Sequence, residues 1–432
     1  MAKTAIVINP YIFDFKLYDE WMHPLGLYFL IEYLQYYGFQ THFINCLERS
    51  DAPKRFGTGE FKSVEIEKPD LYRQLKRKYK KYGITAEEFK RRLENVPSPD
   101  LICIGSMMTY WLPGVIQTIR EIRQVHPTVQ ILVGGVAAQL FGNYLRENIS
   151  GISVADKEVQ LSEIPFTCRI EQNNFEPSLS AGLKAAEKLP HGPVLSSLGC
   201  PLTCHYCASK KLQPSFHRRP VQLVADEIRL ASELFQAQDF AFYDDALLVQ
   251  FQKTIEELVA SIGDLIGKIR FHTPNGLHLK YLDSRTLELL TELNVTTLRF
   301  GYETSSDRYR HVTNDKANME MLIEKARLIK TAVNHMNVGI YIMAGLPEQK
   351  PEDVLDEMDM VSSLGMQVKP VFISPVPRTP LFSHYVKIWP QIASDPLWHN
   401  DLFFITKLPG WGSDEVELVR HRAKELNQAL MK

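Results

Sequence analysis

Apolar, strand-like stretches alternate with amphipathic, helix-like stretches along the first 150 residues of this 432-residue chain. Strands that are separated by helices form parallel sheets, and both faces of such a sheet must be covered. The alternation therefore predicts an α/β fold in which residues 1–150 form a Rossmann-like, doubly wound parallel sheet. The expected strands are 4–9, 40–46, 100–106 and 129–135, with helices at 23–39 and 114–127.

Two segments interrupt this pattern. Residues 71–96 are rich in lysine and arginine and predict a basic helical insertion. Its charged face is either solvated or a patch that binds a partner. Residues 151–190 are polar and weakly patterned, which predicts a connector between domains.

A second alternating series predicts a partial (β/α)6 barrel of the TIM type over residues 191–385, because six strands are separated by five helices. In such barrels the chemistry gathers at the carboxyl ends of the strands. Residues 386–432 end in an amphipathic helix, which we expect to be a small extension that caps the barrel or covers its open edge. The expected strands are 193–198, 239–245, 269–275, 296–303, 337–345 and 367–374, and the helices are 221–235, 251–263, 284–293, 317–334 and 351–364.

The composition is that of an ordinary globular protein, with 45% hydrophobic and 23% charged residues. A net charge of −2 gives no general attraction to nucleic acid or anionic lipid, and no nucleic-acid-binding module is evident. The first residues are too short for a signal peptide, and no apolar run is long enough to span a membrane. We therefore expect a cytoplasmic protein, in which clustered cysteines hold metal or perform redox chemistry.

Half of the six cysteines lie in "GCPLTCHYC", at Cys200, Cys204 and Cys207, directly after the first expected barrel strand. A structural zinc site is one interpretation, but it usually has four ligands, and His205 is adjacent to Cys204 and poorly placed to bind the same ion. Iron–sulfur clusters also use cysteine thiolates, usually four. Three thiolates would leave one iron of a cubane without a protein ligand, which is typical of a reactive site.

The CxxxCxxC spacing, with Tyr206 before the third cysteine, resembles the signature of the radical S-adenosylmethionine (radical SAM) enzymes. The resemblance implies that Cys200, Cys204 and Cys207 hold a [4Fe-4S] cluster whose fourth iron binds S-adenosyl-L-methionine (SAM). It further implies that an electron from a reductant such as flavodoxin or ferredoxin cleaves SAM to a 5′-deoxyadenosyl radical, which abstracts hydrogen from an unactivated C–H bond.

Four further segments, "FYDDALL", "HTPN", "LRFGYETSS" and "IMAGLPEQ", resemble strand-end motifs of the same family. Two departures occur, since Ser305 and Glu348 stand where the family usually has glycine. The same residues could also be simple strand terminations, with Asp245 as a helix N-cap. The resemblance implies catalytic roles for Asp245 and Glu303 and contacts to SAM from Tyr206, Asp244, Asn275, Gly301, Glu303 and Gly345.

The first domain resembles that of the cobalamin-binding subgroup of radical SAM enzymes. "HPLGLYFLIEYLQYYGFQT", "PDLICIGSMMTYW" and "VQILVGGVAAQ" carry this resemblance, which implies that Ser106, Thr109, Gly134 and Gly135 contact cobalamin. The cobalt-ligating DxHxxG pattern of other cobalamin domains is absent. Two interpretations stay open: cobalamin bound without a protein nitrogen below cobalt, or a domain that has lost cobalamin.

Together these features predict a radical SAM enzyme that transfers a methyl group from cobalamin to an unactivated carbon. A cobalamin-independent rearrangement, cyclisation or oxidation is the alternative within the enzyme class. A non-catalytic iron–sulfur or zinc protein that senses redox state or binds a partner is the alternative outside it. The substrate stays open among small molecules, lipids and peptides. Cys46 and Cys103 end expected core strands and are predicted to be buried structural thiols, whereas Cys168 lies in the connector.

Overall fold

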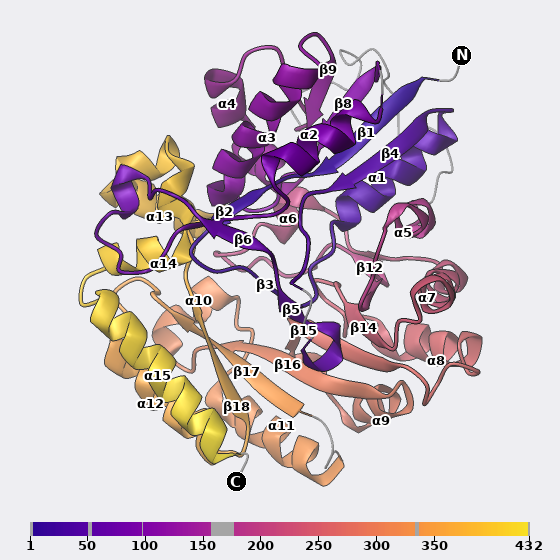
Figure 1. Ribbon diagram of the computed structural model, residues 1–432. Helices are drawn as coiled ribbons and strands as arrows, with labels where there is room; N and C mark the ends of the chain where they lie inside the picture. Colours follow the sequence, from indigo (N-terminus) through magenta and orange to yellow (C-terminus); the bar gives the residue numbers. More distant parts are fainter. Residues whose placement is uncertain (1–2, 51–53, 97, 157–176, 333–336, 431–432) are drawn as a thin grey trace. The chain divides into compact units, whose positions relative to one another are not determined.

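The computed structural model describes residues 3–50, 54–96, 98–156, 177–332 and 337–430 (Figure 1). The chain divides into two compact units. The first consists of residues 1–190 with Ser394–Leu397, and the second of His191–Ala393 with Trp398–Lys432. Cys168 lies outside the described residues. Among the described residues, no helix combines the length and the apolar character that a membrane crossing requires.

The first unit is built on a five-stranded parallel sheet with the order β10-β9-β8-β1-β4. From β1 the chain moves to β4 on one side, and later from β8 to β9 and β10 on the other. The order therefore reverses between β1 and β8, which is where doubly wound sheets bind ligands. The strands are β1 (Thr4–Asn9), β4 (Gln40–Asn45), β8 (Leu101–Ile104), β9 (Gln130–Val133) and β10 (Ser153–Val154).

Helices cover both faces of this sheet (Figure 1). Alternate residues of β1 show why: Ile6 and Ile8 pack with one set of helices, and Ala5 and Val7 pack with the other. The predicted Rossmann-like fold is thus confirmed. One face carries α1 (Leu25–Tyr36) and α5 (Ser180–Ala185), and the other carries α2 (Ala86–Glu94), α3 (Leu112–Val125) and α4 (Val136–Asn148).

The basic insertion differs from the prediction, because only its second half is helical. Residues Lys80–Tyr82 form strand β7, which pairs antiparallel with β2 (Ile12–Asp14) and β6 (Ser63–Glu65). The pairing of β7 with β2 joins segments that are far apart in the chain, so no pattern within the basic segment indicates it. Strand β6 is closer to β7 in the chain. Two further short strands, β3 (Tyr18–Asp19) and β5 (Gly59–Glu60), pair antiparallel with each other.

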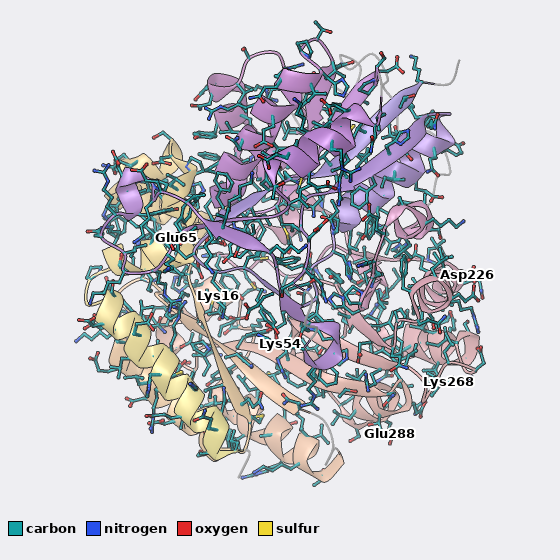
Figure 2. All side chains as sticks on the ribbon, in the orientation of Figure 1. Lys16, Lys54, Glu65, Asp226, Lys268 and Glu288 are labelled. Carbon is teal, nitrogen blue, oxygen red and sulfur yellow. The ribbon has the colours of Figure 1, made fainter. Side chains whose placement is uncertain are left out.

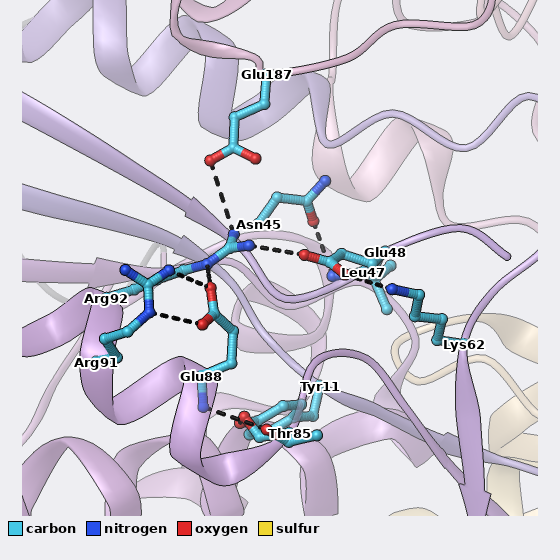
Figure 3. Close-up of polar contacts among 10 residues, drawn as sticks. All are labelled: Tyr11, Asn45, Leu47, Glu48, Lys62, Thr85, Glu88, Arg91, Arg92 and Glu187. Carbon is cyan, nitrogen blue, oxygen red and sulfur yellow. Dashed lines mark hydrogen bonds and ion pairs between the residues drawn. The ribbon is translucent and has the colours of Figure 1, made fainter. Parts of the chain in front are cut away.

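Carboxylates neutralise much of the positive charge on α2. The Arg92 side chain lies 2.7 Å from both Glu88 and Glu48 and 3.8 Å from Glu187, and Arg91 also pairs with Glu88 (Figure 3). This arrangement favours an ordinary charged helix face over a binding patch for a polyanion.

The second unit confirms the predicted partial barrel. Its six strands are parallel and neighbour one another in the order β11-β14-β15-β16-β17-β18, with helices along the outside (Figure 1). The strands are β11 (Gly192–Val194), β14 (Asp239–Phe242), β15 (Arg270–His278), β16 (Val295–Glu303), β17 (Asn337–Ala344) and β18 (Gln367–Phe372). The helices are α7 (Val221–Phe235), α8 (Phe251–Ser261), α9 (Ser284–Glu292), α11 (Met319–Ala332) and α12 (Pro351–Ser363). Charged side chains such as Asp226, Lys268 and Glu288 project outward from this layer (Figure 2).

The first expected barrel strand is divided in two. After β11 the chain leaves the sheet, and β12 (Ser197–Leu198) pairs antiparallel with β13 (His217–Arg218). This small ribbon closes the loop that contains the three clustered cysteines and the short helix α6 (Ser209–Leu212).

The C-terminal segment covers an edge of the barrel sheet, as predicted. Helix α15 (Ser413–Ala429) packs against β18 and α12 (Figure 1). The Asn427 side chain bonds both the N–H and the carbonyl of Val368, so it satisfies backbone groups on the edge strand. Two shorter helices, α13 (Pro380–Ile388) and α14 (Asp401–Phe404), precede it.

Candidate active site

The cysteine loop begins immediately after β12, at Gly199. Its φ is +78°, and a Cβ there would lie 2.5 Å from the carbonyl oxygen of Ser215, so only glycine fits without strain. Cys200 and Cys204 are buried, whereas Cys207 is exposed and its thiol lies 3.2 Å from the hydroxyl of Ser209. Burial raises the pKa of the Cys200 thiol and raises the pKa of Cys204 to about 11.

The C-terminal end of the short helix α10 (Arg310–Thr313), together with the next residue, is bonded to the cysteine loop. The N–H of His205 donates to the carbonyl of Val312 at 2.9 Å, and the Cys204 thiol donates to the carbonyl of Thr313 at 3.3 Å. The Thr203 hydroxyl also bonds the Asn314 side chain at 3.2 Å. These contacts hold residues 312–314, and with them the following lysine, beside the cysteines.

That lysine, Lys316, forms a buried ion pair with Glu303 at the end of β16. The Nζ and Oε1 atoms are 2.7 Å apart, and both side chains are 9% exposed. Glu303 has a φ of +74° next to an irregularity in the pairing of β16 with β17. Burial lowers the pKa of Lys316, but the Glu303 carboxylate outweighs burial and holds the pKa above its usual value. Lys316 is a site residue that sequence reasoning missed.

One buried polar atom near this pair, Nδ1 of His278, lacks a hydrogen-bond partner among the described residues. The hydroxyl of Tyr206 is also buried, and it interacts with the Cys204 thiol. Burial, followed by the charge of Lys316, lowers the pKa of His278 to about 3. Burial and the charge of Glu303 hold the pKa of Tyr206 well above its usual value. An unpartnered buried polar atom is costly unless a ligand or water completes its hydrogen bonds, so Nδ1 of His278 indicates a binding site in this region.

The two neighbouring aspartates have different surroundings. The Asp244 carboxylate accepts hydrogen bonds from the Ser196 hydroxyl at 2.7 Å and the Ser197 hydroxyl at 2.5 Å, and it is buried. It therefore fixes the strand end before the cysteine loop, and the contact to SAM predicted for it stays untested. Asp245 is exposed and interacts electrostatically with Cys200. Partial desolvation of its carboxyl group, together with the charge of Asp244, raises the pKa of Asp245 against an opposing hydrogen bond with Ser209.

Three other predicted SAM contacts have structural partners here. Asn275 is exposed, and its amide donates to the carbonyl of Tyr243 at 3.0 Å. A Cβ on Gly301 would lie 2.4 Å from Nζ of Lys316, so this glycine makes room for the ammonium. The N–H of Gly345 bonds Gln349, and its carbonyl accepts a hydrogen bond from Tyr385. Contacts of these residues with SAM stay predictions.

The four predicted cobalamin contacts lie at the carboxyl edge of the first unit's sheet. The Ser106 hydroxyl donates to the carbonyl of Gly134 at 2.7 Å and accepts from the N–H of Ala138 at 3.0 Å. Gly135 has a φ of +97°, and a Cβ there would lie 2.3 Å from the Ser106 carbonyl oxygen. Thr109 is buried. The structure brings these residues together, while their contact with cobalamin stays a prediction.

The loop between Ser106 and Thr109 presents two exposed apolar side chains that sequence reasoning did not single out. Met107 is 51% exposed and Met108 is 39% exposed. The loop follows β8, one of the two strands between which the sheet order reverses. Cys46 and Cys103 are buried, as predicted for structural thiols.

The donor set suits a cluster better than a single ion. Among the described residues, no group of three His, Cys, Asp or Glu side chains is arranged to hold one metal ion. In a cubane each thiolate binds a different iron, so the thiols need not converge on one point. Cys200 and Cys204 both interact electrostatically with Cys207, so the three thiols share one site. Three thiols and an adjacent buried cation fit a [4Fe-4S] cluster with one open corner.

Comparisons with known proteins agree with this geometry. Residues 194–361 match the family model of the radical SAM superfamily. The chain is similar to a tRNA-2-methylthio-N(6)-dimethylallyladenosine synthase of Corynebacterium efficiens, at 23% identity over 319 residues that cover 66% of this chain and 59% of that protein. A protein of the same name from Nitratiruptor sp. is 23% identical over 211 residues, which cover 46% of this chain and 48% of that protein. The chain thus spans about half to three fifths of these relatives.

Two solved structures share the fold across both units. One is the radical S-adenosylmethionine methyltransferase TsrM from Kitasatospora setae with cobalamin and a [4Fe-4S] cluster bound, with a TM-score of 0.62 and 14% identity over 100% of this chain and 89% of that chain. The other is the cobalamin-dependent S-adenosylmethionine radical enzyme OxsB, with a TM-score of 0.57 and 13% identity over 99% of this chain and 62% of that chain. At these identities the likeness is one of fold.

Proposed function

We propose that this chain, whose residues 194–361 form a radical SAM domain, is a cobalamin-dependent methyltransferase that acts on an unactivated carbon of its substrate. The observation that carries the radical SAM part is the meeting of three strand ends at one site. Cys200, Cys204 and Cys207 follow β11 and β12, Asp245 follows β14, and Glu303 ends β16. Carboxyl strand ends are where barrels of this type perform chemistry.

In this proposal Cys200, Cys204 and Cys207 would hold the cluster. A [4Fe-4S] cluster supplies, when bound, the electron that cleaves SAM to methionine and a 5′-deoxyadenosyl radical. The residues of the chain bind and orient. We expect Asp245 to accept a hydrogen bond from the SAM ammonium, because it is exposed, whereas Asp244 is buried and its carboxylate accepts hydrogen bonds from Ser196 and Ser197.

The neighbouring Glu303 and Lys316 present a carboxylate and an ammonium side by side, which matches the two charges of an α-amino acid group. The buried Tyr206 hydroxyl is a further polar group near this pair, and it also interacts with the Cys204 thiol. We expect these three side chains to orient the methionine end of SAM, because a bond at its sulfonium breaks only when that end is held in one position.

The first unit supports cobalamin as the methyl donor. Its fold is shared with TsrM, the structure of which contains cobalamin. The exposed side chains of Met107 and Met108 stand on the loop after β8, next to the reversal of strand order, and an apolar ring such as corrin would cover them. Cobalamin supplies, when bound, the methyl group.

The first experiment tests the radical SAM chemistry. Full-length protein reconstituted with iron and sulfide under anaerobic conditions is reduced, supplied with SAM and assayed for 5′-deoxyadenosine. We expect formation of 5′-deoxyadenosine by the wild type and its loss in Cys204→Ala, because the cluster would lose a thiolate. Cys103→Ala is a matched control, since this buried thiol lies in the other unit. Formation of 5′-deoxyadenosine by Cys204→Ala at the wild-type rate would refute the assignment.

A second experiment tests the methyl transfer. Protein purified anaerobically with added cobalamin should retain a corrinoid absorption spectrum after gel filtration. If methyl transfer occurs, S-adenosylhomocysteine should appear beside 5′-deoxyadenosine only when cobalamin is bound. Protein that retains no corrinoid and forms 5′-deoxyadenosine alone would instead support a cobalamin-independent radical reaction.

The sequence relatives favour one further candidate, modification of a tRNA base. The two functions are separable with an RNA substrate. An enzyme that methylthiolates RNA would convert a base of unmodified tRNA, whereas our proposal expects tRNA to remain unchanged.

A further inference from the structure

We infer that the positive charge of Lys316 sets the reduction potential of the cluster that the cysteine loop holds. This inference rests on the proposed function, because it requires a [4Fe-4S] cluster on Cys200, Cys204 and Cys207. It concerns a residue outside the cysteine motif, brought to the site by the fold.

The chain is built to keep Lys316 beside the cysteines. Hydrogen bonds from Thr203, Cys204 and His205 fasten residues 312–314 to the cysteine loop. Asn314 and Asp315 then have φ values of +58° and +49°, an uncommon conformation for two successive non-glycine residues. This sharp turn directs the next residue, Lys316, back into the protein, where it is 7% exposed.

The space around the ammonium is also provided by the fold. Gly301 lies beneath it, and a Cβ there would approach Nζ to 2.4 Å and Cε to 3.0 Å. The Glu303 carboxylate, 2.7 Å away, compensates the charge of the ammonium and offsets the free-energy cost of burying a lysine. A lysine placed only for solubility would need neither the glycine nor the buried carboxylate.

The two charges of the ion pair do not cancel at Cys204, because the ammonium of Lys316 acts on this thiol more strongly than the carboxylate of Glu303 does. Burial is the largest influence on the pKa of Cys204, and Lys316 is the strongest charged influence, ahead of Glu303. Lys316 also lowers the pKa of Cys200, where Asp245 has the larger and opposite influence. Lys316 is therefore a buried positive charge that acts on both thiols, and at Cys204 its influence exceeds that of its partner Glu303.

A positive potential favours the reduced cluster. One electron from a protein reductant enters the cluster, no bond breaks, and the cluster gains one negative charge. A nearby buried cation stabilises that added charge, and the potential of iron–sulfur clusters depends on such local charge. Lys316 should therefore make the cluster easier to reduce.

The test is a redox titration of the cluster, monitored by electron paramagnetic resonance, in full-length anaerobically reconstituted protein without SAM. We expect Lys316→Met to lower the equilibrium constant for reduction of the cluster at least about tenfold. This corresponds to a shift of the midpoint potential to more negative values by about 59 mV for one electron. Lys316→Arg should restore most of the wild-type potential. Glu303→Gln should shift the potential in the opposite direction.

Two variants protect the test against misfolding and against nonspecific effects. The double variant Lys316→Met with Glu303→Gln removes both charges at nearly constant volume, so no unpaired charge stays buried, and it should still shift the potential negatively. Lys268→Met removes an exposed lysine of the same unit and should leave the potential unchanged.

An unchanged or more positive potential in both Lys316→Met and the double variant would overturn the inference while leaving the radical SAM proposal intact. Wild-type protein that takes up no iron and labile sulfide would overturn the proposed function, and the inference with it.

Discussion

The ion pair between Arg219 and Glu227 offers a sharp test of what holds the cysteine loop in place. Two guanidinium nitrogens lie 2.6 and 2.9 Å from the two carboxylate oxygens, and the side chains are only 1% and 2% exposed. Arg219 also donates to the carbonyl of Leu195 from its side chain and to that of Ser196 from its backbone. The pair thus anchors the chain between β11 and the cysteines.

Glu227→Gln keeps the shape of the side chain but leaves the buried guanidinium without a charged partner. Breaking a buried pair in this way costs about 3–5 kcal/mol of stability. For a unit of this size each kcal/mol lowers the melting temperature by about 2–4 °C, so the decrease should be roughly 6–20 °C. Urea and thermal unfolding followed by circular dichroism measure both quantities.

The matched control is Arg285→Met, which removes an arginine of the same unit that is 43% exposed and pairs with Glu256 at 2.8 Å. Exposed pairs contribute about 0–1 kcal/mol, so this variant should unfold nearly as the wild type does. A loss below about 1 kcal/mol in Glu227→Gln, or an equal loss in both variants, would refute the reasoning from burial.

Two further expectations follow from other parts of the chain. Gly135→Ala should lose stability, because its Cβ would lie 2.3 Å from the Ser106 carbonyl oxygen, whereas Gly134→Ala meets its nearest protein atom at 3.6 Å and should keep the wild-type stability in thermal unfolding. Equal stability of the two variants would count against the steric argument. Burial lowers the pKa of His399 to about 4, so this side chain binds a proton more readily in the unfolded chain than in the folded one. The free energy of unfolding should therefore fall as the pH drops from 6.5 toward 4, by about 2 kcal/mol at pH 5. His399→Gln should remove that part of the pH dependence in urea titrations, and an unchanged dependence would contradict it.

Much of the fold is predictable from hydrophobic periodicity, because the spacing of apolar residues reflects which face of each helix or strand is buried. The amphipathic stretch 221–235 coincides with α7, and the apolar run 4–9 coincides with β1. The prediction failed at Lys80–Tyr82, where a basic segment forms a strand. The segment pairs with β6 on one side and, on the other, with β2, which is far away in the sequence, so no pattern within the segment indicates the pairing.

The sequence by itself determined the order of strands and helices and, through the spacing of Cys200, Cys204 and Cys207, the chemistry that the second unit can support. The order of elements and the cysteine spacing are local properties, since side-chain periodicity and motif spacing depend only on residues close together in the sequence. Only the tertiary structure decided that Asp244 fixes a strand end while Asp245 is exposed, and that Lys316 is buried against Glu303. Lys316 stands among polar residues in "TNDKAN", and its role arises from hydrogen bonds to a loop more than a hundred residues away, which no local pattern encodes.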